Sequence, residues 1–203
     1  MKTIISFDID GVLANFVQGF VKTVNKVFPE KNAPKDYQPD GWNFPGLVTP
    51  EEMKEAWDAL VATPNLWLNL KTYFENVAAL SRFLQAEHKN FDVYYITSRV
   101  DTPGDSALSQ TSKWLIKYNL LMYNTSLLVV KEAKDKQALL RALHVEASVD
   151  DYLPTAISSN ELPRHKSFLY HRPWNAEGRP ENLRVVSNLE SYLNEVIELH
   201  QSK

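Results

Sequence analysis

The sequence of 203 residues predicts an α/β protein, with a Rossmann-like, mainly parallel sheet, helices on both faces of that sheet, and a small helical cap inserted after the first strand. Two observations predict the sheet. Short apolar runs with β-branched residues recur along the chain, and helical patterns separate most of them, which is typical of strand–helix units. A third observation predicts the insert, because the chain between the first two runs is too long for one crossover helix.

The expected strands and helices alternate along most of the chain. Four apolar runs are the clearest strand candidates and two weaker ones follow: Ile4–Phe7, Val93–Ile96, Leu127–Val130 and Val145–Val149, then Phe168–Tyr170 and Arg184–Ser187. Helices are expected from a cap at Asn76 onward, around Ser109–Tyr118, over Lys136–Leu143 and over Leu189–His200. We therefore expect a core formed by residues 1–12 and 71–203.

Residues 13–70 carry the pattern of a helical cap. Apolar residues from Leu13 to Phe28 recur at helical spacing and predict an amphipathic helix. Thr49-Pro50-Glu51-Glu52 predicts the start of a second helix, with a Thr cap, Pro at the first position and Glu at the third. The aromatic residues of Pro29–Pro45 favour an ordered connection. We expect these elements to lie above the carboxyl edge of the sheet.

Composition excludes several classes of function. The formal net charge is −3 and like charges form no run, which argues against binding of polymeric nucleic acid or of an anionic membrane. The chain has no cysteine, so a disulfide, a thiol nucleophile and a cysteine metal site are excluded. No apolar stretch approaches ~20 residues, so we expect no membrane span and a cytoplasmic location. The oligomeric state stays open, with a homodimer among the alternatives.

The first expected strand runs directly into acidic residues. Asp8 and Asp10 follow Ile4–Phe7, and residues i and i+2 of an extended chain point the same way. Two carboxylates held together repel each other unless a cation lies between them or one keeps its proton. Gly11 then permits a tight turn that brings backbone N–H groups close to an anion. This pattern predicts a site for Mg²⁺ and phosphate.

The next three expected strands also end in polar residues. Thr97-Ser98-Arg99 follows the second, a segment with Lys131, Lys134 and Lys136 follows the third, and Asp150-Asp151 follows the fourth. The carboxyl ends of parallel strands meet at one edge of a sheet, where ligands bind. Alone, each of these motifs is also typical of an ordinary turn, cap or solvated surface. Together they predict one site.

Each of these residue types has a task in phosphoryl transfer. A hydroxyl of Thr97 or Ser98 can donate to a phosphoryl oxygen, and a lysine can neutralise developing charge. Mg²⁺ prefers carboxylate, carbonyl, water and phosphate oxygens. The candidate metal ligands are the carboxylates of Asp8, Asp150 and Asp151 and the carbonyl of Asp10.

Together, Asp8-Ile9-Asp10-Gly11, Thr97-Ser98, a downstream lysine and Asp150-Asp151 resemble the four motifs of the haloacid dehalogenase (HAD) superfamily of phosphohydrolases. The resemblance implies that Asp8 is the nucleophile that forms an aspartyl-phosphate. It implies that Asp10 is the general acid toward the leaving alkoxide and then the base toward the hydrolytic water. It also favours Asp151 over Asp150 as the direct metal ligand. A cap after the first strand is similar to the helical type of this superfamily.

The first motif extends into a more specific resemblance. Residues Asp8–Phe16 are similar to a string in the 5′(3′)-deoxyribonucleotidases, whose phenylalanine packs against the nucleobase, and this implies the same role for Phe16. Asn65-Leu66-Trp67 resembles a cap motif of that family. The expected substrate-binding residues are Phe16, Ser98, Arg99, Trp42 and Trp57.

Three features depart from that family's pattern. Asn15 stands where the family usually has Asp, and Arg99 stands where it tends to have Pro. The segment after the third strand is longer, so the place of the motif lysine is not unique. Lys136 is favoured because a helix leads from it directly into the next strand, while Lys131 and Lys134 stay open.

The sequence therefore predicts a Mg²⁺-dependent phosphomonoesterase with a small phosphorylated substrate, namely a (deoxy)nucleoside 5′-monophosphate. A sugar phosphate or a 3′-phosphate end is the alternative substrate, and a catalytically silent binding module is the alternative without enzymatic activity. A receiver-type signalling domain also uses Asp pairs, Thr/Ser and Lys, but no acid pair follows its lysine. Asp150-Asp151 and the long first crossover argue against that class.

Overall fold

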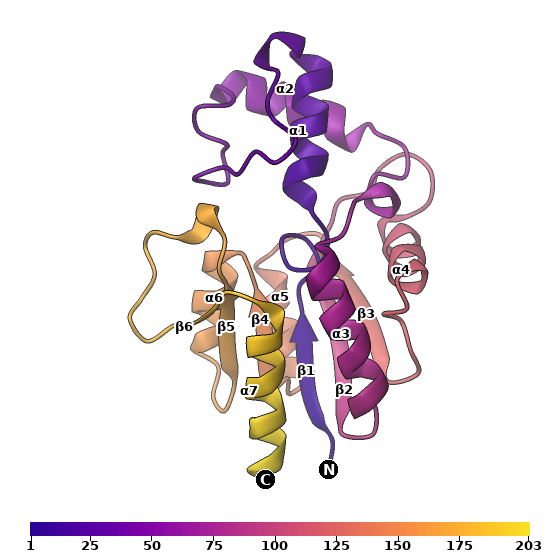
Figure 1. Ribbon diagram of the computed structural model, residues 1–203, viewed down its shortest axis with the longest axis vertical. Coiled ribbons are helices and arrows are strands. Elements are labelled where there is room, and N and C mark those ends of the chain that lie inside the picture. Colours follow the sequence, from indigo (N-terminus) through magenta and orange to yellow (C-terminus); the bar gives the residue numbers. More distant parts are fainter.

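The computed structural model describes residues 1–203, and a six-stranded sheet forms its centre (Figure 1). Its strands are β1 (Thr3–Phe7), β2 (Phe91–Ser98), β3 (Thr125–Val130), β4 (Ala147–Asp150), β5 (Lys166–Tyr170) and β6 (Arg184–Val186). All neighbouring strands pair in parallel, in the order β3-β2-β1-β4-β5-β6. The strand order reverses at β1, so the exit of β1 lies at the switch point where open parallel sheets bind ligands.

Five helices cover the two faces of the sheet. The helices α3 (Phe74–Glu87), α4 (Ala107–Lys117) and α7 (Leu189–Gln201) contribute to the large core cluster on one face, and α5 (Asp135–Ala142) and α6 (Leu153–Asn160) pack on the other. Side chains of β2 alternate between these two faces, as in any strand. Val93 and Tyr95 belong to the large cluster on one face, and Ile96 packs with Leu140 of α5 on the other. Figure 1 shows α3 and α7 side by side in front of the sheet. This arrangement confirms the predicted α/β class.

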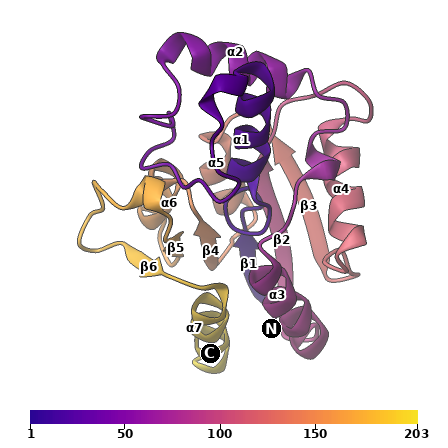
Figure 2. The ribbon, with the colours of Figure 1, turned by 45° about the horizontal axis from the view of Figure 1, so that its top comes forward.

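The insert after β1 lies beyond the carboxyl ends of the strands in Figure 1 and Figure 2. It contains α1 (Phe16–Val27) and α2 (Pro50–Val61), which pack against each other, and the short 3₁₀ turns η1 (Pro29–Lys31) and η2 (Trp67–Asn69). The predicted capping signal is present at α2. The N–H of Glu52 donates to Thr49 Oγ1 at 3.3 Å, and the N–H of Thr49 donates to the Glu52 carboxylate at 2.8 Å.

Side chains of α1 hold the long connection between α1 and α2. The Asn25 amide exchanges two hydrogen bonds of 2.8 Å with the backbone of Ala33. Phe44 is buried, and its ring centroid lies 4.3 Å from that of Phe20. The aromatic residues of this segment are thus used in packing, as their presence predicts.

The two chain segments that join the insert to the sheet run side by side. The N–H of Asn15 donates to the carbonyl of Lys71 at 2.7 Å, and the N–H of Tyr73 donates to the carbonyl of Leu13 at 2.8 Å. Ala14 and Thr72 form an antiparallel bridge between these bonds. These backbone bonds hold the two ends of the insert together at the sheet edge.

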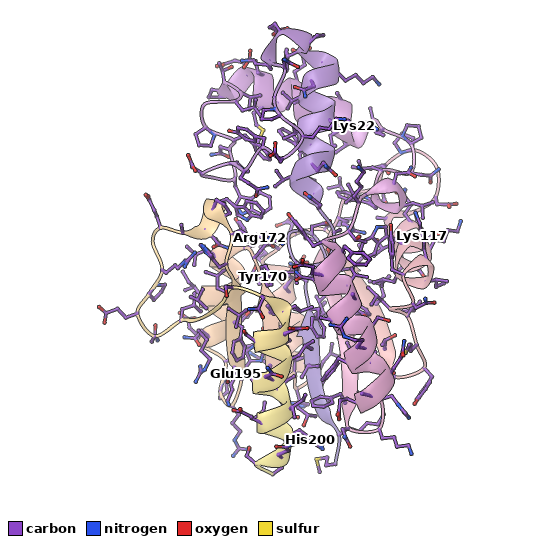
Figure 3. All side chains as sticks on the ribbon, viewed as in Figure 1. Lys22, Lys117, Tyr170, Arg172, Glu195 and His200 are labelled. Atoms are coloured by element: carbon purple, nitrogen blue, oxygen red, sulfur yellow. The ribbon has the colours of Figure 1, made fainter.

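Two element-level expectations are corrected, and one helix was not predicted. Asn76 does not cap a helix, because it lies inside α3. Its buried amide donates to the Val12 carbonyl at 2.6 Å and to the hydroxyl of Tyr170, which is labelled in Figure 3, at 3.0 Å. The strand expected from Val145 begins at Ala147. The sequence pattern does not predict α6, since its serines and asparagine weaken the helical signal.

None of the helices has the length and apolar character needed to cross a bilayer.

Candidate active site

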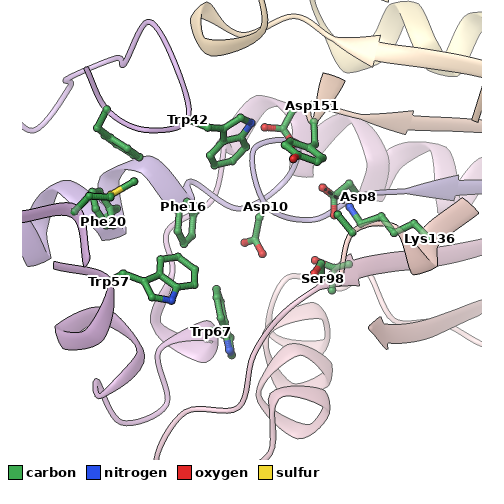
Figure 4. A pocket seen from close by; sticks show the side chains of 15 residues that line it. Asp8, Asp10, Phe16, Phe20, Trp42, Trp57, Trp67, Ser98, Lys136 and Asp151 are labelled. Carbon is green, nitrogen blue, oxygen red and sulfur yellow. Dashed lines mark ion pairs between the residues drawn. The ribbon is translucent and has the colours of Figure 1, made fainter. Parts of the chain in front are cut away.

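Three buried aspartates and one buried lysine meet where β1 and β4 end and α5 begins, and Figure 4 shows three of these residues, Asp8, Asp151 and Lys136. The Lys136 Nζ lies 2.9 Å from Asp8 Oδ2 and 2.8 Å from Asp150 Oδ2. One oxygen each of Asp8, Asp150 and Asp151 lies within 4.8 Å of the others. Residues that are far apart in the sequence therefore come together at the sheet edge where their motifs were expected.

Only one of the three lysines after β3 reaches this cluster. The Lys136 side chain is 4% exposed, because the start of α5 points it toward β1 and β4. Lys134 is exposed and pairs with Glu132 at 2.6 Å, and Lys131 is exposed as well. The geometry thus singles out Lys136 as the lysine of the site, while its catalytic role stays a prediction.

Burial and like charge make this cluster electrostatically unfavourable. Burial raises the pKa of Asp8 to about 7; the Lys136 charge lowers it in part, and the neighbouring carboxylates raise it. Burial and the charges of Asp8 and Asp150 also raise the pKa of Asp151 well above its usual range. Burial works against the charge of Lys136, but Asp150 and Asp8 outweigh it and raise the lysine pKa. Three carboxylates thus face a single ammonium, and one further cation would relieve their repulsion.

The two adjacent acids Asp150 and Asp151 have different surroundings. Both Asp150 oxygens are engaged, one by Lys136 and the other by the N–H of Tyr152 at 2.8 Å. Asp151 accepts a bond of 2.9 Å from the Trp174 indole on one oxygen, and its other oxygen has no protein donor. Gly11, with a φ of 78°, leaves room beside it, because a Cβ at that position would overlap the Asp151 carboxylate. Asp151 therefore has the greater free capacity for a metal.

The Asp10 side chain turns away from the acidic cluster. Because β1 ends at Phe7 and the chain turns at Gly11, the extended geometry that would align Asp10 with Asp8 does not continue. Both Asp10 oxygens instead accept from Arg99, from Nε at 2.9 Å and from Nη2 at 2.8 Å. Arg99 is predicted to bind substrate, but its side chain is 0% exposed, pairs with Asp10 and does not line the cavity described below.

Thr97 and Ser98 end β2 beside the cluster and line the cavity described next. The Thr97 hydroxyl is buried and has no hydrogen-bond partner. Buried polar groups are nearly always paired, so this hydroxyl is a donor free for an anion in the cavity. Ser98 Oγ donates to the Lys131 carbonyl at 3.1 Å.

A cavity of about 310 Å³ extends from the acidic cluster toward the insert (Figure 4). The wall opposite the cluster is aromatic. The centroid of the Phe16 ring lies 6.2 Å from those of Trp42 and Trp57 and 6.3 Å from that of Trp67. The buried Trp42 Nε1 has no partner. The lining residues are Asp8, Asp10, Phe16, Phe20, Trp42, Phe44, Met53, Trp57, Trp67, Thr97, Ser98, Ala133, Lys136, Asp151 and Tyr152.

Comparison with known families agrees with this geometry. Residues 2–151 match the family model described as 5′ nucleotidase, deoxy (Pyrimidine), cytosolic type C protein. The chain belongs to this family. It is therefore a phosphoric monoester hydrolase of the 5′-nucleotidase type, within the HAD superfamily that its motifs resemble. A comparison with curated protein sequences gives no significant match.

Solved structures share the fold of this nucleotidase-family chain. A HAD-like hydrolase from Streptococcus pneumoniae has a TM-score of 0.60 and 11% identity, covering 96% of this chain and 98% of its own. The HAD-hydrolase YfnB from Bacillus subtilis has a TM-score of 0.56 and 13% identity, with coverage of 96% and 98%. A HAD phosphatase from Thermococcus onnurineus has a TM-score of 0.53 and 15% identity, with coverage of 97% and 98%. At these identities the likeness shows the HAD-like fold alone.

Two residues of this nucleotidase-type site carry no motif in the sequence. Trp174, in the 3₁₀ turn η3 (Pro173–Asn175), donates to the Asp151 carboxylate, and Asn175 donates to the Asp151 carbonyl at 2.7 Å. The sequence around them mixes basic, aromatic and amide groups, which is compatible with a pocket border or with an edge loop. Only the packing of β5 beside β4 brings this segment against Asp151.

Proposed function

We propose that this protein is a Mg²⁺-dependent phosphomonoesterase that hydrolyses a (deoxy)nucleoside 5′-monophosphate through an aspartyl-phosphate on Asp8. The observation that carries the proposal is the two-ended cavity. Its polar end holds the acidic cluster, Lys136 and the unpartnered Thr97 hydroxyl, and its other end is aromatic. A phosphate suits the first end and a flat nucleobase suits the second. The family description supports a nucleotide substrate.

The residues at the acidic end fit Mg²⁺. Burial, and after it the repulsion between the carboxylates, raises the pKa values of Asp8 and Asp151, and a bound cation offsets both effects. Mg²⁺ takes few protein oxygens, and water and phosphate complete its shell. The carboxylates of Asp8 and Asp151 would hold the ion, with the Asp10 carbonyl as a third ligand and Asp150 beside them. When bound, Mg²⁺ neutralises charge on the phosphoryl oxygens. The Bacillus subtilis YfnB structure is described as bound to magnesium, which supports this choice of ion.

The reaction on these residues has two steps. First, an Asp8 oxygen attacks phosphorus, the bond from phosphorus to the ester oxygen breaks, and the leaving alkoxide takes a proton from Asp10. Water then attacks phosphorus and gives a proton to Asp10, and the bond from phosphorus to Asp8 breaks. Inorganic phosphate leaves, with Asp8 again a carboxylate and Asp10 again an acid. Protonated Lys136 and the Thr97 hydroxyl stabilise the charge on the transferring group.

We assign substrate selection to residues 13–70 as the cap, and catalysis to the core of residues 1–12 and 71–203. Phe16 is the platform for the base, and Trp42 and Trp57 flank it. Ser98 lies at the phosphate end of the cavity. A cytoplasmic location is part of the proposal, because the family is described as cytosolic.

A phosphatase screen tests the proposal. The purified protein is assayed with deoxy- and ribonucleoside 5′-monophosphates, nucleoside 3′-monophosphates, sugar phosphates and an aryl phosphate, in Mg²⁺ and in EDTA. We expect the highest kcat/KM with 5′-monophosphates, loss of activity in EDTA and recovery on return of Mg²⁺. Activity that survives EDTA would contradict the metal requirement. A preference for sugar phosphates or 3′-phosphates would replace the substrate, and no turnover of any ester would favour the silent binding module.

A further inference from the structure

Arg99 is a buried cation in direct contact with one wall of the cavity. It directly follows β2, and its side chain is 0% exposed, compared with 15% for Asp10. Its Nη1 donates to Thr111 Oγ1 of α4 at 2.9 Å, while Nε and Nη2 both donate to Asp10. The guanidinium carbon lies 4.9 Å from the centroid of the Trp67 ring. Protein groups therefore surround the guanidinium on its edge and on one face.

These contacts fix the Asp10 carboxylate in one orientation. Two parallel N–H···O bonds from a guanidinium set both the position and the plane of a carboxylate, which one point charge does not do. Thr111 and Trp67 in turn hold the guanidinium, and the Trp67 indole donates to the Val100 carbonyl at 2.8 Å. Asp10 still lines the cavity, so the orientation that Arg99 sets is the one that a substrate meets.

We propose that Arg99 is a positioning residue for Asp10, and that the bidentate pair aims the Asp10 carboxyl group at the ester oxygen and then at the attacking water. The inference rests on the proposed function, in which Asp10 moves the proton. Arg99 itself does not line the cavity. The contact with Trp67, which also faces Phe16, links this pair to the aromatic wall of the cavity.

The leaving group separates a positioning role from a structural one. An aryl phosphate releases a weakly basic oxygen that needs no proton, whereas a nucleoside 5′-monophosphate releases an alkoxide that does. For a reaction through a phosphoenzyme, kcat/KM covers only the steps up to departure of the leaving group. A misaligned Asp10 therefore lowers kcat/KM for the nucleotide and spares it for the aryl ester. Water attack needs Asp10 with either substrate, so the phosphoenzyme should accumulate.

The test compares Arg99→Met with the parent, with Asp10→Asn and with Arg82→Met. The last variant makes the same substitution at an exposed ion pair between α3 and α7. We expect Arg99→Met to lower kcat/KM for the nucleotide at least about 10-fold more than for the aryl phosphate, as Asp10→Asn does. Rapid quench with the aryl ester should show a phosphoenzyme burst in both variants. Arg99→Lys should restore part of the loss, and Arg82→Met should resemble the parent.

Several outcomes separate this inference from the proposed function. If Asp10→Asn shows the difference between the two substrates and Arg99→Met shows equal loss or none, the positioning role is wrong and the proposed function stands. A parent protein that hydrolyses no phosphate ester overturns both. If Arg99→Met fails to fold, Thr111→Val keeps the arginine and removes one of its anchors, and it should show the same difference with smaller amplitude. Equal loss with both substrates in Thr111→Val would overturn the proposal.

Discussion

The two ends of the cavity contrast in how they are built. At the acidic end, burial raises the pKa values of Asp8 and Asp151, so their charged forms are held at a cost to the fold. At the aromatic end, Phe16 is buried among three tryptophans, and burial of such rings stabilises the fold. Burial therefore opposes stability at the end to which we assign catalysis, whereas it favours stability at the end to which we assign substrate recognition.

This contrast predicts that substitutions at the two ends have opposite effects on stability. At the acidic end a substitution should remove activity and leave the fold as stable or more stable. At the aromatic end it should reduce stability and change which substrates are used. Three experiments test the contrast, in order of decreasing effect.

The largest effect is expected for Asp8→Asn. The amide keeps the shape of the side chain and removes the nucleophile, so hydrolysis of an aryl phosphate in Mg²⁺ should fall on the order of 10³-fold or more. Lys136 keeps its pair with Asp150, and one repelling carboxylate is gone, so the thermal midpoint should not fall. Asp92→Asn, at an exposed pair with Lys2, is the matched control. Near-parent turnover by Asp8→Asn would refute the nucleophile assignment.

The next effect is a pH dependence of the free energy of unfolding of the metal-free protein. The pKa of Asp8 is about 7 in the folded state and near 3.8 when unfolded, so between these values the folded state binds more protons. Stability should therefore fall as the pH rises through this window, with Asp151 acting in the same direction.

Urea unfolding in EDTA at about pH 5.5 and about pH 8 measures this difference in the free energy of unfolding, and Asp8→Asn should reduce it. Mg²⁺ should raise stability at the higher pH. A metal-free protein that is more stable at about pH 8 would contradict this electrostatic account.

The smallest effect on turnover is expected for Phe16→Ala. Loss of a stacking platform should lower kcat/KM about 10- to 100-fold more for a nucleoside monophosphate than for an aryl phosphate. The variant should also lose about 3 kcal/mol of stability, because a buried ring is removed. Phe83→Ala, in the core of α3, should lose stability without changing the ratio of the two substrates. An unchanged ratio in Phe16→Ala would make Phe16 a core residue only.

The sequence predicts more of the acidic end of the cavity than of the aromatic end. Asp8, Thr97 and Asp150-Asp151 each follow a recognisable strand, and parallel pairing brings strand ends to one edge. The orientation of Asp10 could not be predicted, because it depends on where β1 stops and on Arg99, which follows β2. Trp174 could not be assigned either, since only the packing of the segment after β5 brings it to Asp151.

The aromatic wall lies between these cases. The resemblance of Asp8–Phe16 to the nucleotidase motif implies the role of Phe16, and helical spacing places Trp57 on one side of its helix. Their mutual contact depends on how α1 and α2 pack. Trp42 belongs to an irregular segment whose path has no periodic signal. Its position beside Trp174, with ring centroids 5.6 Å apart, joins the insert to the core and could not be read from either segment alone.

The place of β1 in the sheet has a consequence for biosynthesis. Asp8 directly follows β1, whose neighbours in the sheet are β2 and β4, and both of these strands are synthesised much later than β1. The acids that complete the cluster lie at the end of β4 and just beyond it. During synthesis the proposed nucleophile therefore lacks the partners that bury it until β4 has emerged, and the proposed Mg²⁺ site cannot assemble before residue 151 has emerged. Because such long-range pairing is slow, the proposed metal site should assemble only when β1 and β4 pair, and not during early local folding.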